Sequence, residues 1–202
     1  MTGITSLGTT SLLQFYARSA GITNYSASSY SVQDNAKLQQ VNKQITGLNG
    51  AAQELQTSLK AFSKSGLLSR LLKDEADSSS FQVLARDAVD KLVKAYNKFD
   101  DIIKSSTYIT GEGAKLLDQV RELLNGKDSD DFRKLGLSLD KHTGKLKLDD
   151  KKLLAALQDD TSTAKKLIFG DKHLAPMLDE IVKSVLGKQA GYYFNKPFVV
   201  NV

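Results

Sequence analysis

The feature that most constrains the fold of this chain is a stripe of apolar residues between positions 38 and 62. Successive members are alternately three and four residues apart, which places all of them along one side of an α-helix. They are Leu38, Val41, Ile45, Leu48, Ala52, Leu55, Leu59 and Phe62. Because polar residues surround the stripe, it is narrow and fits a seam against one or two other helices, as in a coiled coil. We therefore predict a long helix that packs along one side.

A second stripe with the same spacing follows Ser80, a residue type that often caps the N-terminus of a helix. Its members are Phe81, Ala85, Ala88, Leu92, Ala95, Phe99 and Ile102. Residues 63–80 lie between the stripes and contain Gly66 and a run of serines, which favour a connection. Two matched stripes joined by a connection predict an antiparallel helical hairpin.

The two stripes supply the candidate interface residues, because a stripe can be buried either within one chain or between chains. With Tyr96 from the second helix added, the candidates for a helix seam or partner interface are Leu38, Val41, Ile45, Leu48, Leu55, Leu59, Phe62, Phe81, Leu92, Tyr96, Phe99 and Ile102.

The middle of the chain changes from helical to strand periodicity. Residues 108–113 contain two glycines and predict a loop, and residues 114–124 predict a short amphipathic helix. Asn125 and Gly126 should end this helix, because both tolerate the left-handed conformation. Leucines then alternate at positions 135, 137 and 139 and again at 146 and 148, which predicts a β-hairpin at about 135–149 with its turn between Asp140 and Gly144.

The last third predicts further helices and a tail. Asp149 should cap a helix over residues 150–157, a short helix should begin at Thr161 or Ser162 and end near Gly170, and another should span residues 174–186. The tail over residues 188–202 is apolar and aromatic, and predicts a strand-like docking segment or a contact surface. Its candidate docking residues are Tyr192, Tyr193, Phe194 and Phe198.

These patterns predict a mainly α protein with one small β-hairpin, built as an antiparallel helical bundle. Residues 1–35 are rich in Ser, Thr, Gly and Tyr and have no sustained periodicity, so we expect a disordered or loosely ordered N-terminal arm. The bundle should then occupy residues 36–187, ahead of the tail.

Few residues are suited to catalysis or metal binding. The chain has no cysteine and two histidines, His142 and His173, neither of which has a partner at a meaningful spacing. The Gly111-Glu112-Gly113 segment follows no strand, so a flexible linker explains it better than a phosphate-binding loop. We therefore expect no catalytic, cofactor or metal site, and no enzyme.

Charge and hydropathy also limit the partners. The net charge is +5, but lysines alternate with carboxylates instead of clustering, which argues against nucleic-acid binding. No apolar stretch approaches the roughly 20 residues of a membrane span. Residues 1–20 lack the basic and apolar regions of a cleaved signal peptide, so an exported chain would use another route.

The order of elements from residue 81 to 186 resembles the C-terminal half of bacterial flagellar filament-capping proteins, also called the second hook-associated protein. The resemblance begins with the helix that contains Tyr96-Asn97 and continues through the short helix around residues 116–124. It includes the hairpin segments Leu135-Gly136-Leu137-Ser138-Leu139-Asp140, Gly144-Lys145-Leu146 and Leu148-Asp149, then Leu153 to Leu157, and it closes with Lys165-Lys166-Leu167-Ile168-Phe169-Gly170. The stripe at residues 38–62 also resembles the N-terminal helix that packs on this half in the family. Family members usually insert variable domains where this chain has residues 63–80, and usually continue into a long helix beyond the equivalent of Leu186.

The resemblance implies a structural or assembly component of the bacterial flagellum that acts through protein–protein contacts. It implies flagellin or hook-associated proteins as partners, a homo-oligomer, and an extracellular, flagellum-associated location reached without a cleaved signal peptide. Two alternatives remain open. One is a cytoplasmic helical adaptor or regulator that binds a flagellar export substrate, which fractionation would separate. The other is a basic nucleic-acid binder, which would be retained on a polyanion in a salt-dependent way.

Overall fold

The computed structural model describes five stretches of the chain: residues 32–63, 78–126, 129–159, 174–188 and 190–195. The chain divides into two compact units, of which the larger comprises residues 45–195 and the smaller comprises residues 1–44 with 196–202. In the smaller unit the described residues are the first part of one helix, on which Leu38 and Val41 are buried. From residue 45 on, the elements described below belong to the larger unit.

Both predicted long helices are present. Helix α2 spans Val32–Leu59 and continues into a 3-10 turn, η2, at Lys60–Phe62, and helix α4 spans Ser78–Ser105. Of the first stripe, every member is buried except Ile45, which is half-buried. Helix α4 begins two residues before Ser80, so Ser80 lies in its first turn and is not the cap that we predicted.

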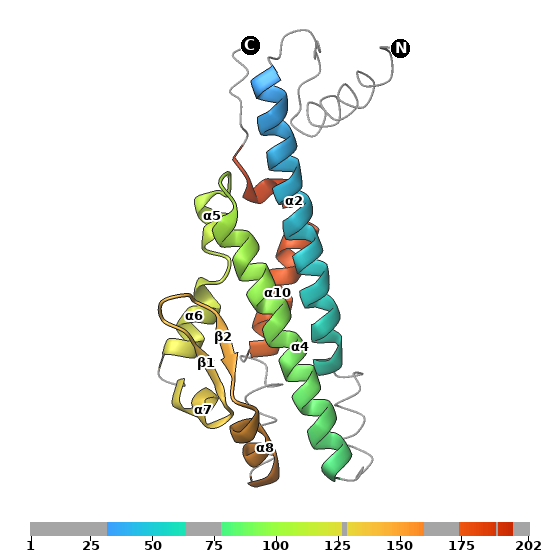
Figure 1. The fold of residues 1–202 in the computed structure, drawn as a ribbon, viewed down its shortest axis with the longest axis vertical. Coiled ribbons are helices and arrows are strands. Elements are labelled where there is room, and N and C mark those ends of the chain that lie inside the picture. Colours follow the sequence, from blue (N-terminus) through green and yellow to red (C-terminus); the bar gives the residue numbers. More distant parts are fainter. Residues whose placement is uncertain (1–31, 64–77, 127–128, 160–173, 189, 196–202) are drawn as a thin grey trace. The chain divides into compact units, whose positions relative to one another are not determined.

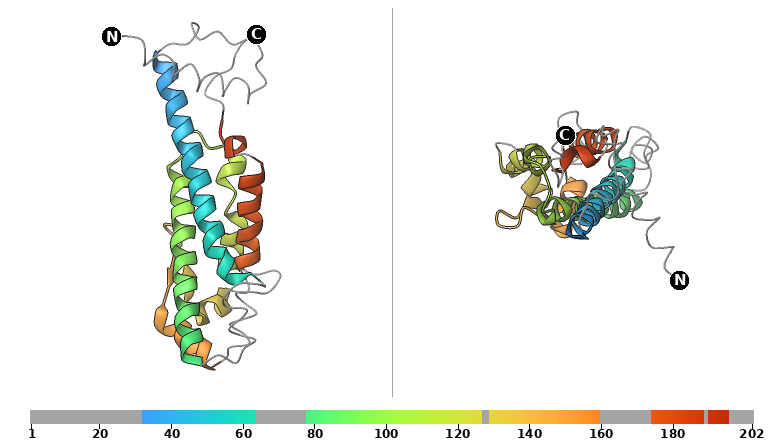
Figure 2. Two further views of the ribbon diagram at one scale, coloured as in Figure 1. Left: turned by 90° about the vertical axis from the view of Figure 1, so that its right-hand side faces the viewer. Right: turned by 90° about the horizontal axis from the view of Figure 1, so that it is seen from above.

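The second half of α2 runs antiparallel to α4, as the matched stripes predicted. Lys98 on α4 forms an ion pair with Glu54 on α2. A Cβ placed on Gly47 would lie 3.5 Å from the Ile102 side chain. Because the earlier residue of α2 contacts the later residue of α4, the two helices run in opposite directions, and Figure 2 shows them side by side.

The buried face of α4 is wider than the predicted stripe. Its buried apolar residues are Phe81, Ala85, Ala88, Val89, Leu92, Val93, Tyr96, Phe99 and Ile103. Ala95 and Ile102, which we placed on the stripe, are half-buried. The reason is that α4 packs against α2 and also contacts strand β2 and helix α8, so residues on a second side of the helix are covered.

The segment after α4 differs from the prediction. Residues 111–114 form a single helical turn, α5 (Gly111–Ala114), which Thr110 caps by accepting a hydrogen bond from the Gly113 N–H. Helix α6 spans only Asp118–Asn125. Gly126 ends it in an extended conformation (φ −80°, ψ −159°), so the left-handed ending that we predicted is wrong. A helix that we did not predict, α7 (Ser129–Lys134), follows.

The β-hairpin is confirmed. Strands β1 (Leu137–Leu139) and β2 (Leu146–Leu148) pair antiparallel, with Leu139 opposite Leu146. In the turn, the Asp140 carboxylate accepts hydrogen bonds from the N–H groups of His142 and Thr143, and Gly144 adopts a positive φ of 68°. In Figure 1, β2 lies on the side of the hairpin that faces α4.

The hairpin leads into helix α8 (Asp150–Asp159). Asp149 caps it, as predicted, because its carboxylate accepts a hydrogen bond of 3.2 Å from the Lys152 N–H. Leu153 and Leu157 are buried on the inner face of this helix. The short helix predicted between Thr161 and Gly170 lies outside the described residues.

The C-terminal part adds helix α10 (Leu174–Gly187) and a 3-10 turn, η3 (Ala190–Tyr193). The apolar face of α10 is buried, and Gly187 is its last residue, so the helix ends one residue later than predicted. After η3, Phe194 forms an antiparallel bridge with Ile109, and the Thr110 N–H donates to the Tyr193 carbonyl oxygen. The start of the predicted tail is therefore built into the larger unit.

Candidate functional site

The described residues contain no group of three or more His, Cys, Asp or Glu side chains placed to hold a metal ion. His142 is exposed in the hairpin turn, whereas His173 lies outside the described residues. No helix within the described stretches is long and apolar enough to cross a membrane. Several hydrogen bonds and ion pairs between different elements of the larger unit lie where the hairpin meets α4 and where α4 meets α6.

Asn97 attaches the hairpin to α4. Its side-chain amide donates to the Leu146 carbonyl oxygen at 2.9 Å, and its side-chain oxygen accepts from the Leu146 N–H at 2.8 Å. A strand at the edge of a sheet has unpaired backbone groups, and here one amide side chain pairs with both groups of one residue. We call this two-bond contact the Asn97 clamp. The resemblance singled out Asn97, but its role became visible only in the structure.

A buried carboxylate lies one turn further along α4. The side chain of Asp100 has no exposed surface, and it pairs with Arg121 of α6 at 2.9 Å and with Lys104 of α4. Arg121 also pairs with Asp118 at 2.8 Å. Burial lowers the pKa of Arg121, but its hydrogen bonds to Asp100 and Asp118 outweigh this effect and raise the pKa above its ordinary value. Each member of the Asp100–Arg121 pair therefore has a second charged partner, Lys104 for Asp100 and Asp118 for Arg121.

Lys104 carries the network into the hairpin turn. Its ammonium group pairs with Asp100 and also donates a hydrogen bond to the Thr143 carbonyl oxygen. A Cβ on Gly144 would lie 2.6 Å from the Lys104 ammonium nitrogen. A glycine at this position therefore serves two needs, because it adopts the positive φ of the turn and leaves room for Lys104.

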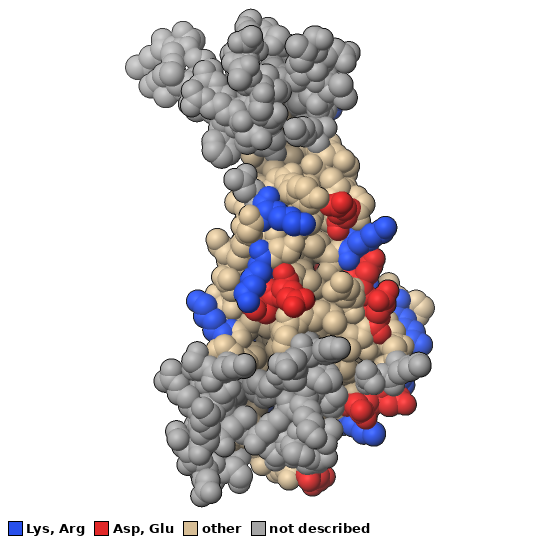
Figure 3. Space-filling view, turned by 180° about the vertical axis from the view of Figure 1, so that it is seen from behind, with Lys and Arg blue, Asp and Glu red and all other residues tan. Residues whose placement is uncertain are grey.

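Exposed ion pairs also hold the hairpin turn and α8 against α4. Lys145 in the turn pairs with Asp101 of α4 at 2.9 Å, and Arg86 of α4 pairs with Asp150 of α8 at 2.8 Å. The Asp140 carboxylate accepts a hydrogen bond from Lys147, which has the largest effect on its pKa, and further hydrogen bonds from the N–H groups of the turn. Together these bonds hold the pKa of Asp140 well below the usual range. Figure 3 shows Lys and Arg side chains interspersed with Asp and Glu side chains on one face of the molecule, without a large patch of one sign.

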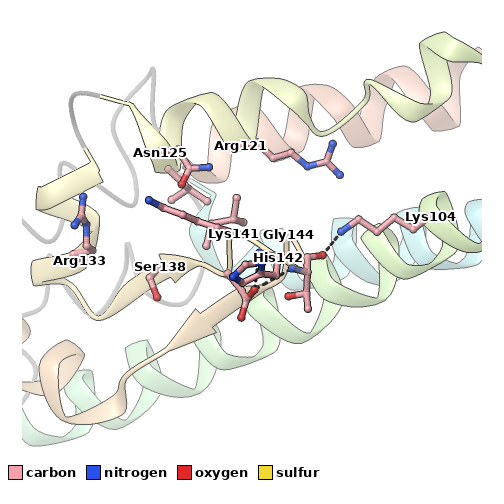
Figure 4. Close-up of a pocket in the computed structure, with 12 residues that line it drawn as sticks. Lys104, Arg121, Asn125, Arg133, Ser138, Lys141, His142 and Gly144 are labelled. Atoms are coloured by element: carbon pink, nitrogen blue, oxygen red, sulfur yellow. Dashed lines mark hydrogen bonds between the residues drawn. The ribbon is translucent and has the colours of Figure 1, made fainter.

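A cavity of about 480 Å³ lies beside this network, between the hairpin turn, α6 and α7. Its lining includes four basic side chains, Lys104, Arg121, Arg133 and Lys141, and also Leu139 and His142. Figure 4 shows Arg133 and Lys141 on one side of the hairpin turn and Lys104 and Arg121 toward the other. The sequence pattern does not indicate this cavity, because the basic residues that line it are dispersed over 38 positions from Lys104 to Lys141.

The candidate seam residues are placed as follows. Most are buried in the described part of the chain, with relative exposures of 8% or less, and Ile45 and Ile102 are half-buried. Of the candidate docking residues, Tyr193 and Phe194 are buried, whereas Tyr192 is exposed at 51%. Phe198 lies outside the described residues. The Tyr192 ring meets the Tyr193 ring edge-on at 5.3 Å, and the Lys188 ammonium nitrogen lies 5.0 Å from the Tyr192 ring centroid.

Comparisons with known proteins bear on the part of the chain that holds these contacts. A family model described as "Flagellar hook-associated protein 2 C-terminus" matches residues 82–198. A curated protein, the flagellar hook-associated protein 2 of Salmonella typhimurium, is 29% identical over an alignment of 164 residues that covers 68% of this chain. The chain spans 33% of the length of that relative. No solved structure matches the chain significantly. The matched segment includes the Asn97 clamp, the Asp100 network and the whole hairpin.

Proposed function

Because the chain belongs to the flagellar hook-associated protein 2 C-terminus family, we propose that it is a structural component of the bacterial flagellum with a role like that of the filament cap. It acts through contacts with other proteins, and not by catalysis. The observation that carries this proposal is the family match over residues 82–198, together with the similarity to the Salmonella typhimurium protein.

The contacts of the larger unit support a structural role. The Asn97 clamp and the ion pairs at Lys145 and Arg86 join the hairpin and α8 to the long helix α4. The buried Asp100–Arg121 pair joins α6 to the same helix. Groups fixed in this way hold a surface in one shape, and a preformed surface binds with a smaller loss of conformational entropy. We propose that the larger unit is a rigid scaffold that presents contact surfaces to flagellar subunits.

The partners that we propose are flagellin and hook-associated proteins, and we also propose that the chain forms homo-oligomers and is exported to the flagellum. The N-terminal arm and the C-terminal tail are the segments proposed to make some of these contacts. Two large apolar side chains of the described residues are exposed, Val83 at 56% and Tyr192 at 51%. Exposed aromatic residues are enriched at the centres of protein interfaces, so Tyr192 is the first residue to test.

The decisive experiment uses the native cell. Filaments from cells with and without the gene are imaged, and the protein is located by fractionating the culture into cytoplasm, medium and sheared filaments. The proposal expects defective filaments without the gene and recovery of the protein with the filament fraction. Normal filaments together with a protein confined to the cytoplasm would refute it and favour the cytoplasmic adaptor.

A point variant separates contact from folding. Tyr192→Ser should leave the helical circular dichroism unchanged and reduce complementation of the deletion, because the exposed ring lies at the surface. Gln119→Ser, an exposed position on α6, is the matched control and should complement fully. Full complementation by Tyr192→Ser would remove this residue from the proposed interface without affecting the assignment of the larger role.

A further inference from the structure

The outer edge of strand β1 has free backbone groups. In an antiparallel pair, alternate residues direct their N–H and C=O groups toward the partner strand and away from it. The Asp140 N–H donates to the Lys145 carbonyl oxygen, so Asp140 points toward β2, and its neighbour Leu139 points away. The position of Leu146, opposite Leu139, agrees with this alternation, because Leu146 directs both its groups to Asn97.

The two edges of the hairpin therefore differ. The Asn97 clamp satisfies the edge of β2 at Leu146, whereas the N–H and C=O of Leu139 have no hydrogen-bond partner among the described residues. Leu139 is half-buried and lines the 480 Å³ cavity. An unpaired strand edge can accept an extended segment of another chain as an additional strand.

The charge of the cavity wall indicates which kind of peptide segment would bind there. Four basic side chains line it, whereas Asp140 is its one acidic lining residue, and Asp140 is already paired with Lys147 at 2.6 Å. The carboxylates that pair with Lys104, Arg121 and Arg133 belong to Asp100, Asp118 and Asp130, which do not line the cavity. Lys141 is exposed and has no ion pair with a described residue. The wall thus presents basic groups, and four of these side chains are labelled in Figure 4.

We propose that this cavity binds an acidic segment of a partner protein in an extended conformation. The segment adds a strand at the edge of β1, where its backbone pairs with the N–H and C=O of Leu139. Its acidic side chains face Lys141 and Arg133. The volume of the cavity is within the range of about 300–1,000 Å³ that is common for ligand sites in proteins. This inference does not depend on the flagellar role, because it rests only on the strand edge and the charges of the wall.

A binding assay with short peptides tests the proposal. A fluorescein-labelled peptide of alternating aspartate and valine is titrated with the full chain, and its anisotropy is measured at low and high salt. We expect saturable binding that weakens as the salt concentration rises. A peptide of alternating lysine and valine should not bind. N-methylation of the backbone amides of the acidic peptide should weaken binding, because it removes the donors that pair with the strand edge.

Matched variants locate the site. Lys141→Glu lies in an exposed turn and should weaken binding of the acidic peptide about tenfold, because it places like charges together. Lys91→Glu, an exposed position on α4, changes the net charge equally and should leave binding unchanged. Circular dichroism spectra of the two variants should match that of the unmodified chain, which checks that both are folded.

Four outcomes would overturn the proposal. One is the absence of acidic-peptide binding, and a second is an equal effect of Lys141→Glu and Lys91→Glu on binding. A third is equal affinity of the N-methylated peptide, which would exclude pairing at the strand edge. The fourth is competition by N-acetyl-aspartate as strong as that by the peptide, which would make the cavity a site for small anions and not for an extended segment.

Discussion

Removing the Asn97 clamp should destabilise the larger unit by about 2 kcal/mol. In Asn97→Ala, Leu146 loses both partners of its backbone groups, and Leu146 is only 2% exposed. Two net hydrogen bonds, at about 1 kcal/mol each, are lost, and leaving the buried groups unpaired adds to the loss. Alanine regains up to about 0.7 kcal/mol of helix propensity in α4. For a chain of this size the melting temperature should fall by about 4–8 °C.

Asn49→Ala provides the matched control. Asn49 is half-buried within α2, and its side chain has no hydrogen bond with a described residue. Asn49→Ala therefore gains the same helix propensity as Asn97→Ala but loses no hydrogen bond within the described part of the chain. Urea unfolding followed by circular dichroism compares the two variants, and hydrogen exchange of the Leu146 amide reports on the clamp directly. Equal unfolding midpoints of the two variants, or an equally protected Leu146 amide in Asn97→Ala, would show that the clamp does not stabilise the hairpin.

Two further predictions concern the buried residues Gly113 of α5 and Tyr96 of α4. Gly113→Ala would place a Cβ 2.5 Å from the Ile109 side chain and 2.9 Å from the Tyr193 carbonyl oxygen, so it should lower the free energy of unfolding by about 1–3 kcal/mol. Gly111→Ala, where a Cβ meets nothing within 4 Å, should cost nothing, and equal thermal melts for the two would contradict the close packing. Burial first, and the charge of the nearby Asp100 next, raise the pKa of Tyr96 well above its usual range. Its phenol stays protonated in the folded state while the unfolded chain ionises, so stability should fall as the pH rises above about 10. In Tyr96→Phe this alkaline loss, measured by urea unfolding at several pH values, should be smaller, and an unchanged pH profile would show that Tyr96 is not its source.

Local patterns in the sequence determined the elements of this fold. The alternation of three and four residues predicted α2 and α4, because a helix repeats about every 3.6 residues whatever surrounds it. Alternating leucines and the turn between Asp140 and Gly144 predicted the hairpin, because side chains of a strand alternate between its two faces. Asp149 was correctly predicted as the cap of α8. Helix α7 was missed, because its one buried apolar residue, Phe132, creates no periodicity.

The contacts between elements could be decided only by the tertiary structure. Asn97 and Leu146 are 49 residues apart, and nothing in the neighbourhood of either one indicates that an amide side chain will pair with a strand edge. Asp100 and Arg121 are 21 residues apart, and each occurs in a segment where charged residues are common. Gly113, predicted as part of a flexible linker, is required because the segment at Tyr193 packs against it. Periodicity records which side of a helix or strand is covered, but it does not record which group covers it.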